Sequence, residues 1–248
     1  MAFDPTKFKA PKVRRMPVIL LLDVSGSMSG DKITRLNEAV RDMVDSFTDD
    51  KLIEQEIIVA IFTFGSQFGL HTPYTPAAEL KSKGISTFTA GGGTPLGEIL
   101  EMAKAYIDDK ETTKSGDFAP NVVLVSDGEP NNGWERAFNE FKNNGRSAKT
   151  MRISIPIGAD ANIKMMNEFA SPDPERPGNL LTFYAENAAD IASSFNQVVM
   201  SVSTRSRLKD PNSVVVGAGN FDKTPSKSVS KSRFTNSSQS DDDDGDEI

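Results

Sequence analysis

The chain has 248 residues, of which 37% are hydrophobic and 25% charged, a composition typical of a globular α/β domain. Cysteine is absent and histidine occurs once, as His71, which excludes disulfides, thiolate metal sites and cysteine nucleophiles and leaves little room for histidine-based catalysis. The net charge is −7 and the body of the chain is mildly acidic, so we do not expect a nucleic-acid-binding surface.

Residues 1–13 are predicted to form an N-terminal arm ahead of the first strand. Basic residues precede a short apolar stretch, Pro17–Leu22, as they do in a signal peptide. This stretch has only six residues before Asp23, whereas a signal peptide needs roughly 7–15. No apolar run reaches the ~20 residues that span a bilayer. We therefore expect a cytoplasmic protein with no membrane partner.

Apolar, β-branched runs alternate with stretches of helical periodicity along the chain. The predicted strands, in chain order, are Pro17–Asp23, Ile57–Phe64, a short antiparallel edge strand over Gln67–Thr72, Asn121–Ser126, Arg152–Ile157 and Leu180–Ala185. The predicted helices are Asp31–Phe47, Pro95–Asp109, Trp134–Asn143, Ala161–Ala170 and Ala188–Thr204.

This alternation predicts a doubly wound α/β fold with a mostly parallel central sheet, one short antiparallel edge strand and helices on both faces. The unbroken apolar character of Val18–Leu22 and Val122–Val125 is typical of strands that are buried on both sides. In such sheets ligands bind beyond the carboxyl ends of the strands. The loops that follow the strands are therefore the place to look for a site.

Five oxygen-bearing side chains lie where these loops are expected. Asp23, Ser25 and Ser27 alternate directly after the first strand, Asp127 follows a later strand, and Thr94 follows a run of three glycines. Because the carboxyl ends of parallel strands share one edge of the sheet, we expect all five to converge above it. Carboxylate and hydroxyl oxygens suit Mg²⁺, Mn²⁺ or Ca²⁺, so the pattern predicts a divalent-cation site.

This constellation resembles the metal-ion-dependent adhesion site (MIDAS) of the von Willebrand factor A domain. The pattern of that family is Asp-x-Ser-x-Ser, then a distant Thr, then a distant Asp in a turn at a strand end, and all five positions are matched in this order. The resemblance covers residues 14–204. It implies a protein-binding domain without enzymatic activity, whose bound cation takes an Asp or Glu from a protein partner.

A closer resemblance is to the bacterial stand-alone proteins of the tellurium-resistance type. It is carried by Arg14–Pro17, by the GGGTPLG loop and by SDGEP followed by Trp134. Those proteins are small cytosolic domains encoded beside a protein kinase and a PP2C-type phosphatase, or beside tellurium-resistance proteins. The resemblance implies an adaptor or scaffold in a bacterial stress or defence system, with one of those proteins as its partner.

Each of the five residues also has an ordinary explanation, because Asp, Ser and Thr are common in turns and helix caps. Thr94 followed by Pro95 is typical of a helix N-cap with a proline in the first turn. Around the cation we predict a partner-binding rim made of Glu129, Ser66 and Gly93. Glu129 is alternatively a solvated acid at the entry of a helix.

The composition changes after residue 204, so the domain is predicted to span 14–204 and residues 205–248 to be a mostly disordered polar tail. Residues 205–240 carry seven basic and two acidic side chains, and the last eight residues carry six acids. This acidic end is either a solubilising segment or a tethered source of carboxylates that would occupy the cation and inhibit partner binding.

Two other functions remain open. A Mg²⁺-dependent phosphohydrolase of the haloacid dehalogenase type also begins with an Asp at a strand end, but needs a second Asp where this chain has Ser25. An adaptor of an AAA+ ATPase is the other, as some bacterial domains of this family are. A serine hydrolase and a nucleotide-binding loop are disfavoured, because no GxSxG surrounds the serines and no GK[ST] follows the glycines.

Overall fold

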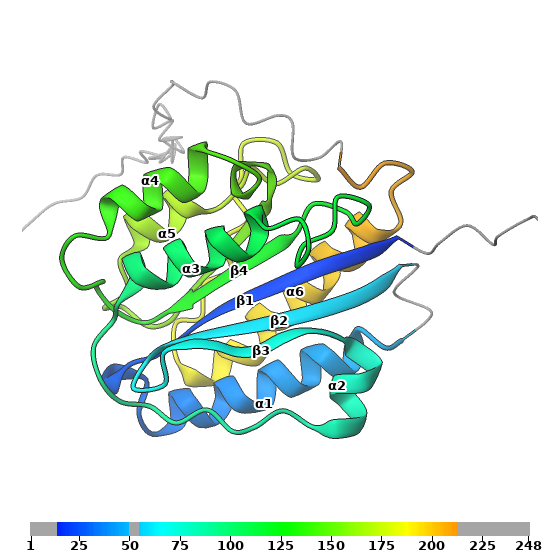
Figure 1. Cartoon of the computed structure of the whole chain (residues 1–248). Coiled ribbons are helices and arrows are strands. Elements are labelled where there is room, and N and C mark those ends of the chain that lie inside the picture. Colours follow the sequence, from blue (N-terminus) through cyan, green and yellow to red (C-terminus); the bar gives the residue numbers. More distant parts are fainter. Residues whose placement is uncertain (1–13, 50–54, 213–248) are drawn as a thin grey trace, which may run out of the picture.

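The strand that carries the predicted site, β1 (Arg15–Val24), lies in the middle of a five-stranded sheet of order β3-β2-β1-β4-β5. The computed structural model describes residues 14–49 and 55–212 (Figure 1). The other strands are β2 (Glu56–Gly65), β3 (Gly69–Pro76), β4 (Asn121–Ser126) and β5 (Met151–Pro156). The α-helices are α1 (Asp31–Ser46), α2 (Ala77–Lys83), α3 (Leu96–Asp108), α4 (Glu135–Asn143), α5 (Ile163–Phe169) and α6 (Ile191–Ser206), with short 3₁₀ turns at Gly26–Met28, Ser147–Lys149 and Ala188–Asp190.

The sheet is mostly parallel, as predicted. β1 pairs in parallel with β2 and β4, and β4 pairs in parallel with β5, whereas the edge strand β3 is antiparallel to β2. In this register Leu22 lies opposite Val125, so the residues that follow them, Asp23 and Ser126, leave the sheet side by side.

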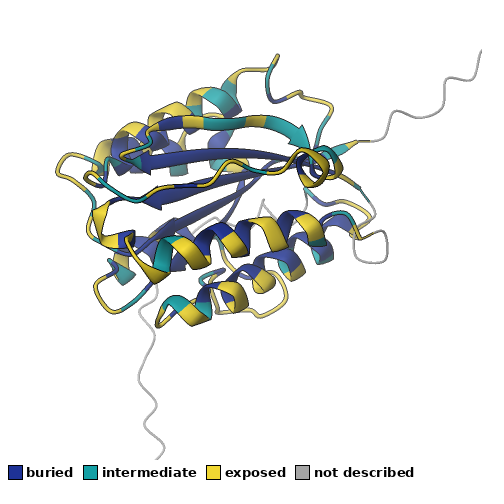
Figure 2. Cartoon of the chain, turned by 90° about the horizontal axis from the view of Figure 1, so that it is seen from below, coloured by how far each residue is buried: buried dark blue, intermediate teal, exposed yellow. Residues whose placement is uncertain are grey.

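Apolar side chains of β1 alternate between two cores, one on each face of the sheet. Val18, Leu20 and Leu22 pack in the core formed with α1 and α6, while Ile19 and Leu21 pack in the core formed with α3, α4 and α5. Figure 2 shows the result: the central strands are buried, the edge strand β3 is partly exposed, and the outward faces of the helices are exposed. A strand that is covered on both faces is held rigidly, and so are the side chains at its end.

The prediction of a strand over Leu180–Ala185 is wrong. The segment lies beside β5, but it makes only isolated parallel bridges, at Thr182 and Ala185, and is not a sixth strand. Its first residue bridges Pro172 in the antiparallel sense, and its Tyr184 carbonyl accepts a hydrogen bond from Ser194 of α6. The segment still makes parallel hydrogen bonds to Ser154, Pro156 and Gly158, but Pro156 has no amide proton to donate, so the ladder that the apolar pattern predicts is interrupted there.

Two further elements differ from the prediction. The antiparallel edge strand is Gly69–Pro76, not Gln67–Thr72, and its two prolines are tolerated because they lie on the edge of the sheet. Helix α2 was not predicted, since its seven residues are too few for helical periodicity to be recognised.

The C-terminal helix continues past the expected domain boundary at residue 204. Arg205 is 2% exposed and donates from Nε to the carbonyl of Pro211 at 2.8 Å and from Nη1 to Asn121 Oδ1 at 2.7 Å. Among the described residues, its Nη2 has no hydrogen-bond partner. Asn212 Oδ1 in turn accepts a hydrogen bond from the amide of Ala119. Residues 205–212 are therefore packed against the amino-terminal end of β4.

Some expectations fall on residues that the structure does not describe. These are the arm over 1–13 and the segment 213–248, which includes the acidic end. Across 14–49 and 55–212, no helix is both long enough and apolar enough to cross a membrane.

We predict that Arg205→Ala lowers the free energy of unfolding by about 3 kcal/mol, because it leaves a cavity and an unpaired Asn121 oxygen. Arg205→Met should cost less, since burial without an anionic partner already lowers the pKa of Arg205 to about 10. Urea unfolding followed by circular dichroism measures both. Lys209→Ala, which removes the same charge at an exposed position, is the control; equal effects of the Arg205→Ala and control variants would contradict the prediction.

Candidate metal centre

Two aspartates lie at the carboxyl ends of neighbouring parallel strands. Asp23 is the penultimate residue of β1 and Asp127 directly follows β4; the exposed fraction of each is 0%. The chain leaves β1 through α1 on one face of the sheet and enters β4 from α3 on the other. The site is therefore at the topological switch point of the sheet, where ligands bind in folds of this kind.

Both carboxylate oxygens of Asp23 accept hydrogen bonds. Oδ1 accepts from the backbone amide of Ser25 at 2.8 Å, and Oδ2 accepts from the hydroxyl of Ser126 at 2.6 Å. Burial nevertheless raises the pKa of Asp23 above its ordinary value, and the charge of Asp127 adds to the increase, while the hydrogen bonds oppose it. The groups that donate to Asp23 in the described part of the chain are neutral, so they bring no positive charge to offset the burial of its carboxylate.

Asp127 is held by a hydroxyl and by a lysine. Ser27 Oγ donates to Oδ1 at 2.7 Å, and the ammonium of Lys32 donates to Oδ2 at 2.6 Å. The hydroxyls of Ser25 and Ser27 are themselves 3.0 Å apart and share a hydrogen bond. Four of the five predicted oxygen donors therefore belong to one hydrogen-bonded group. Asp23 is bonded to Ser25, Ser25 to Ser27, and Ser27 to Asp127.

Thr94, the fifth predicted donor, lies on a loop that is hydrogen-bonded to the end of β1. The amide of Gly91 donates to the carbonyl of Val24, and the amide of Gly26 donates to the carbonyl of Gly92. Gly92 has φ +74°, and a Cβ there would lie 3.0 Å from the backbone nitrogen of Ser66. The loop can approach this closely because it has no side chain at that position.

The alternative explanation of Thr94, as the N-cap of a helix, does not hold. Helix α3 begins at Leu96 with Pro95 at its N-cap position, and no side-chain cap is formed there. Asn131 instead holds Thr94, accepting from its amide at 3.1 Å and donating to its carbonyl at 2.9 Å. Thr94 is 8% exposed, and its hydroxyl has no hydrogen-bond partner in the described part of the chain. That hydroxyl is available to a ligand.

The three predicted rim residues are exposed loop residues around this group. The hydroxyl of Ser66 donates to the carbonyl of Thr89, and Gly93 lies against the side chain of Asn131. Glu129 Oε2 accepts a hydrogen bond from Asn162 at 2.7 Å, so its carboxylate is tied to the start of α5.

Sequence reasoning missed Ser126, Asn131 and Lys32. Ser126 looks like the last residue of a strand, and the contact of Asn131 with Thr94 depends on how two loops meet. Lys32 could have been found from the sequence. It lies in the first turn of α1, where the helix dipole disfavours a cation. A lysine at this position indicates an anion nearby.

The donor set fits a hard divalent cation of the Mg²⁺ type. It offers two carboxylates and three hydroxyls, all oxygen ligands. Across the residues that the structure describes, no cluster of three or more His, Asp or Glu side chains could hold a metal. A cation here would depend on neutral hydroxyls for much of its coordination.

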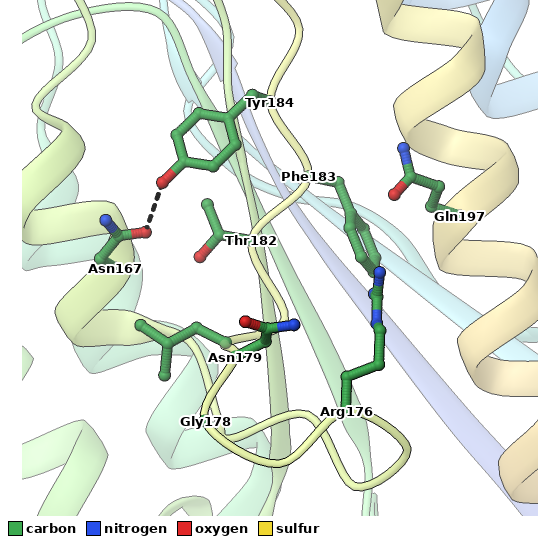
Figure 3. A pocket seen from close by; sticks show the side chains of 9 residues that line it. Asn167, Arg176, Gly178, Asn179, Thr182, Phe183, Tyr184 and Gln197 are labelled. Carbon is green, nitrogen blue, oxygen red and sulfur yellow. Dashed lines mark hydrogen bonds between the residues drawn. The ribbon is translucent and has the colours of Figure 1, made fainter. Parts of the chain in front are cut away.

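One pocket, of about 360 Å³, is shown in Figure 3. It is lined by neutral polar, aromatic and aliphatic residues of the loop over 178–184 and by residues of α5 and α6, and the hydroxyl of Tyr184 donates to Asn167 there. Its charged lining residue, Arg176, pairs with Asp173 at 2.7 Å. None of the predicted site residues lines it.

Residues 18–197 match the von Willebrand factor type A domain. The chain belongs to the von Willebrand factor type A family. It is also 28% identical over 145 residues to the inter-alpha-trypsin inhibitor heavy chain H4 of Homo sapiens; the match covers 56% of this chain and only 15% of that protein.

Solved structures share the type A fold. Proximal thread matrix protein 1 from the mussel byssus aligns with a TM-score of 0.58 at 18% identity, over 77% of this chain and 49% of that one. A von Willebrand factor type A protein from Catenulispora acidiphila aligns with a TM-score of 0.57 at 18% identity, over 75% and 42%. The mussel protein has also been solved with zinc in its MIDAS motif, and that structure aligns with a TM-score of 0.57 at 16% identity, over 77% and 48%. At these identities the likeness shows the fold alone, and this chain spans half or less of those proteins.

We predict that Asp23→Asn raises the melting temperature of the metal-free protein at pH 7 or leaves it unchanged. The raised pKa means that the stability contributed by a protonated Asp23 is present below its unfolded-state pKa and is lost as the pH rises through the folded-state pKa. The neutral amide avoids that loss, so the difference from wild type should vanish as the pH falls towards about 4. Differential scanning calorimetry in EDTA at several pH values measures it. A large loss of stability in the variant at pH 7 would contradict this account.

Proposed function

We propose that this type A domain binds a divalent cation through Ser25, Ser27 and Thr94, with Asp23 and Asp127 coordinating it directly or through water. The domain then presents the cation to a carboxylate of a protein partner. The proposed cation is Mg²⁺, with Mn²⁺ or Ca²⁺ as substitutes that the same oxygen ligands accept. The proposal concerns a docking activity, in which the domain holds another protein without transforming it.

The observation that carries the proposal is the excess of buried negative charge. Two fully buried carboxylates lie in one hydrogen-bonded group, and among the described residues this group contains a single cationic side chain, Lys32. Buried charges of one sign are costly unless they are paired or coordinate a metal. A divalent cation would supply the missing positive charge, and the unpartnered Thr94 hydroxyl would supply a further ligand.

The hydroxyl-rich donor set favours docking over storage. Neutral hydroxyls leave more positive charge on a bound cation than carboxylates do, so the cation stays attractive to a further anionic ligand. An Asp or Glu from a partner would meet this need at the edge of the sheet. In the proposal, the exposed residues Glu129, Ser66 and Gly93 form the rim that contacts the partner.

We infer that the site is not catalytic. Asp23 is fully buried and both its oxygens accept hydrogen bonds, so it is poorly placed to attack a phosphoester. His71 lies on β3, where its ring packs against Phe88 and its Nδ1 meets the hydroxyl of Thr72. Turnover of a phosphoester in Mg²⁺, lost in Asp23→Asn, would favour the phosphohydrolase alternative instead.

The finer part of the proposal rests on the resemblance to the tellurium-resistance type. In it the domain is a cytoplasmic adaptor of a bacterial stress or defence system, and the partner is a protein kinase, a PP2C-type phosphatase or a tellurium-resistance protein. An AAA+ ATPase is the alternative partner. Identification of the proteins retained in the presence of Mg²⁺ separates these choices.

We predict that the protein binds one Mg²⁺ or Mn²⁺ per chain and that Asp23→Asn abolishes binding. Because binding to the folded state stabilises it by about 2.7 kcal/mol at a hundredfold excess over Kd, wild type should melt at a higher temperature in Mg²⁺ than in EDTA, and the variant should not. Titration calorimetry and thermal unfolding measure the two effects. Asp42→Asn, at an exposed position on α1, is the matched control.

We further predict that a protein partner is retained by the immobilised wild-type domain in Mg²⁺ and released by EDTA. The same partner should be lost in Asp23→Asn and kept in Asp42→Asn, since only the first change removes a proposed ligand. Mass spectrometry of the retained proteins measures the difference. An identical set of proteins with and without the metal would defeat the docking mechanism.

A further inference from the structure

Lys32 occupies an unusual place in the candidate centre. Its ammonium donates to Asp127 Oδ2 at 2.6 Å, and the side chain is 28% exposed, whereas that of Asp127 is fully buried. A Cβ on Gly158 would lie 3.9 Å from Nζ, so the head of the lysine also adjoins the loop after β5. The side chain therefore reaches from the first turn of α1 across to the carboxyl ends of β4 and β5.

The position of Lys32 in its helix makes this contact informative. It is the second residue of α1, where the positive end of the helix dipole disfavours a cation. Asp127 offsets that cost. The ion pair is not a solvated surface pair, because one partner is completely buried, and it is therefore only weakly screened by salt.

The charges of the centre can be counted from these contacts. Asp23 and Asp127 contribute two negative charges and Lys32 one positive charge. The centre is then −1 before a divalent cation binds and +1 afterwards. With a neutral residue in place of Lys32 the same centre would be −2 before binding and 0 afterwards. Lys32 thus opposes the cation and favours any anion that arrives after it.

We propose that Lys32 couples cation binding to carboxylate binding, by weakening the affinity of the centre for the divalent cation and strengthening the affinity of the loaded centre for the partner's carboxylate. This inference rests on the proposed function of the centre. The coupling is reciprocal, since a carboxylate that binds the loaded centre more tightly must also retain the cation more tightly. Lys32 makes the centre a poor site for the cation alone and a good site for cation and carboxylate together.

The experiment uses the whole chain with Mn²⁺ and with acetate, the simplest carboxylate, at constant ionic strength. Titration calorimetry gives the Kd for Mn²⁺. The relaxation rate of water protons gives the Kd for acetate, because acetate displaces water from protein-bound Mn²⁺. Lys32→Met removes the charge, and Lys32→Arg keeps it. Lys32→Gln removes the charge but keeps a donor to Asp127, and it replaces the Met variant if that variant does not fold. Lys104→Met on α3 is the matched control, because Lys104 also pairs with an aspartate, Asp108, at 2.7 Å.

We expect Lys32→Met and Lys32→Gln to bind Mn²⁺ about tenfold more tightly and acetate about tenfold more weakly than wild type, because one unit charge near the cation changes both energies in opposite directions. Lys32→Arg and Lys104→Met should match wild type in both. A merely structural role would weaken both ligands together, so that result overturns the inference. Unchanged Mn²⁺ and acetate affinities in Lys32→Met overturn it as well, while the proposed cation site stands. If wild type and all Lys32 variants bind no Mn²⁺, the proposed function itself fails, and the inference with it.

Discussion

Two buried carboxylates at the ends of adjacent parallel strands are the constraint on which the rest of this site depends. Like charges without water must be neutralised, hydrogen-bonded or moved apart. The fold meets the demand in part: Ser126 and the amide of Ser25 hold Asp23, while Ser27 and Lys32 hold Asp127. Burial still raises the pKa of Asp23, and the charge of Asp127 adds to the increase, so these hydrogen bonds only partly offset the cost of burying the carboxylate. The cation that we propose for this centre would supply the missing positive charge.

The sheet holds the two carboxylates in these buried positions. β1 is central, parallel to both neighbours and covered by a core on each face, so Asp23 cannot swing towards solvent. The loop that carries Thr94 is bound to the same strand end by the hydrogen bonds of Gly91 and Gly92 and is held from outside by Asn131. Donors from three separate parts of the chain thereby share a rigid frame, which a metal with strict geometry requires.

The sequence was sufficient to predict the parts of this arrangement that follow from periodicity. Runs such as Val18–Leu22 predicted strands buried on both faces, and the alternation of strands and helices placed their ends on one edge, together with Asp23 and Asp127. It was insufficient where the pairing of a segment depends on its partner strand. Leu180–Ala185 has the apolar pattern of a strand, yet its ladder with β5 is interrupted at Pro156, which has no amide proton to donate. Asn131 and Ser126 act through contacts between distant segments, which no spacing along the chain reveals.

The role that we propose for Lys32 illustrates how charge balance can separate two uses of the same oxygen ligands, retention of a cation and docking of a carboxylate. A centre built only to retain a cation would gain from every negative charge placed near it, as in sites that combine several carboxylates. Here a lysine is held against one of two carboxylates at a helix end that disfavours it. Such an arrangement gives up affinity for the cation alone. It is consistent with a centre whose favoured state includes a second anion supplied from outside the chain, because only then are the lysine, the cation and both carboxylates all balanced.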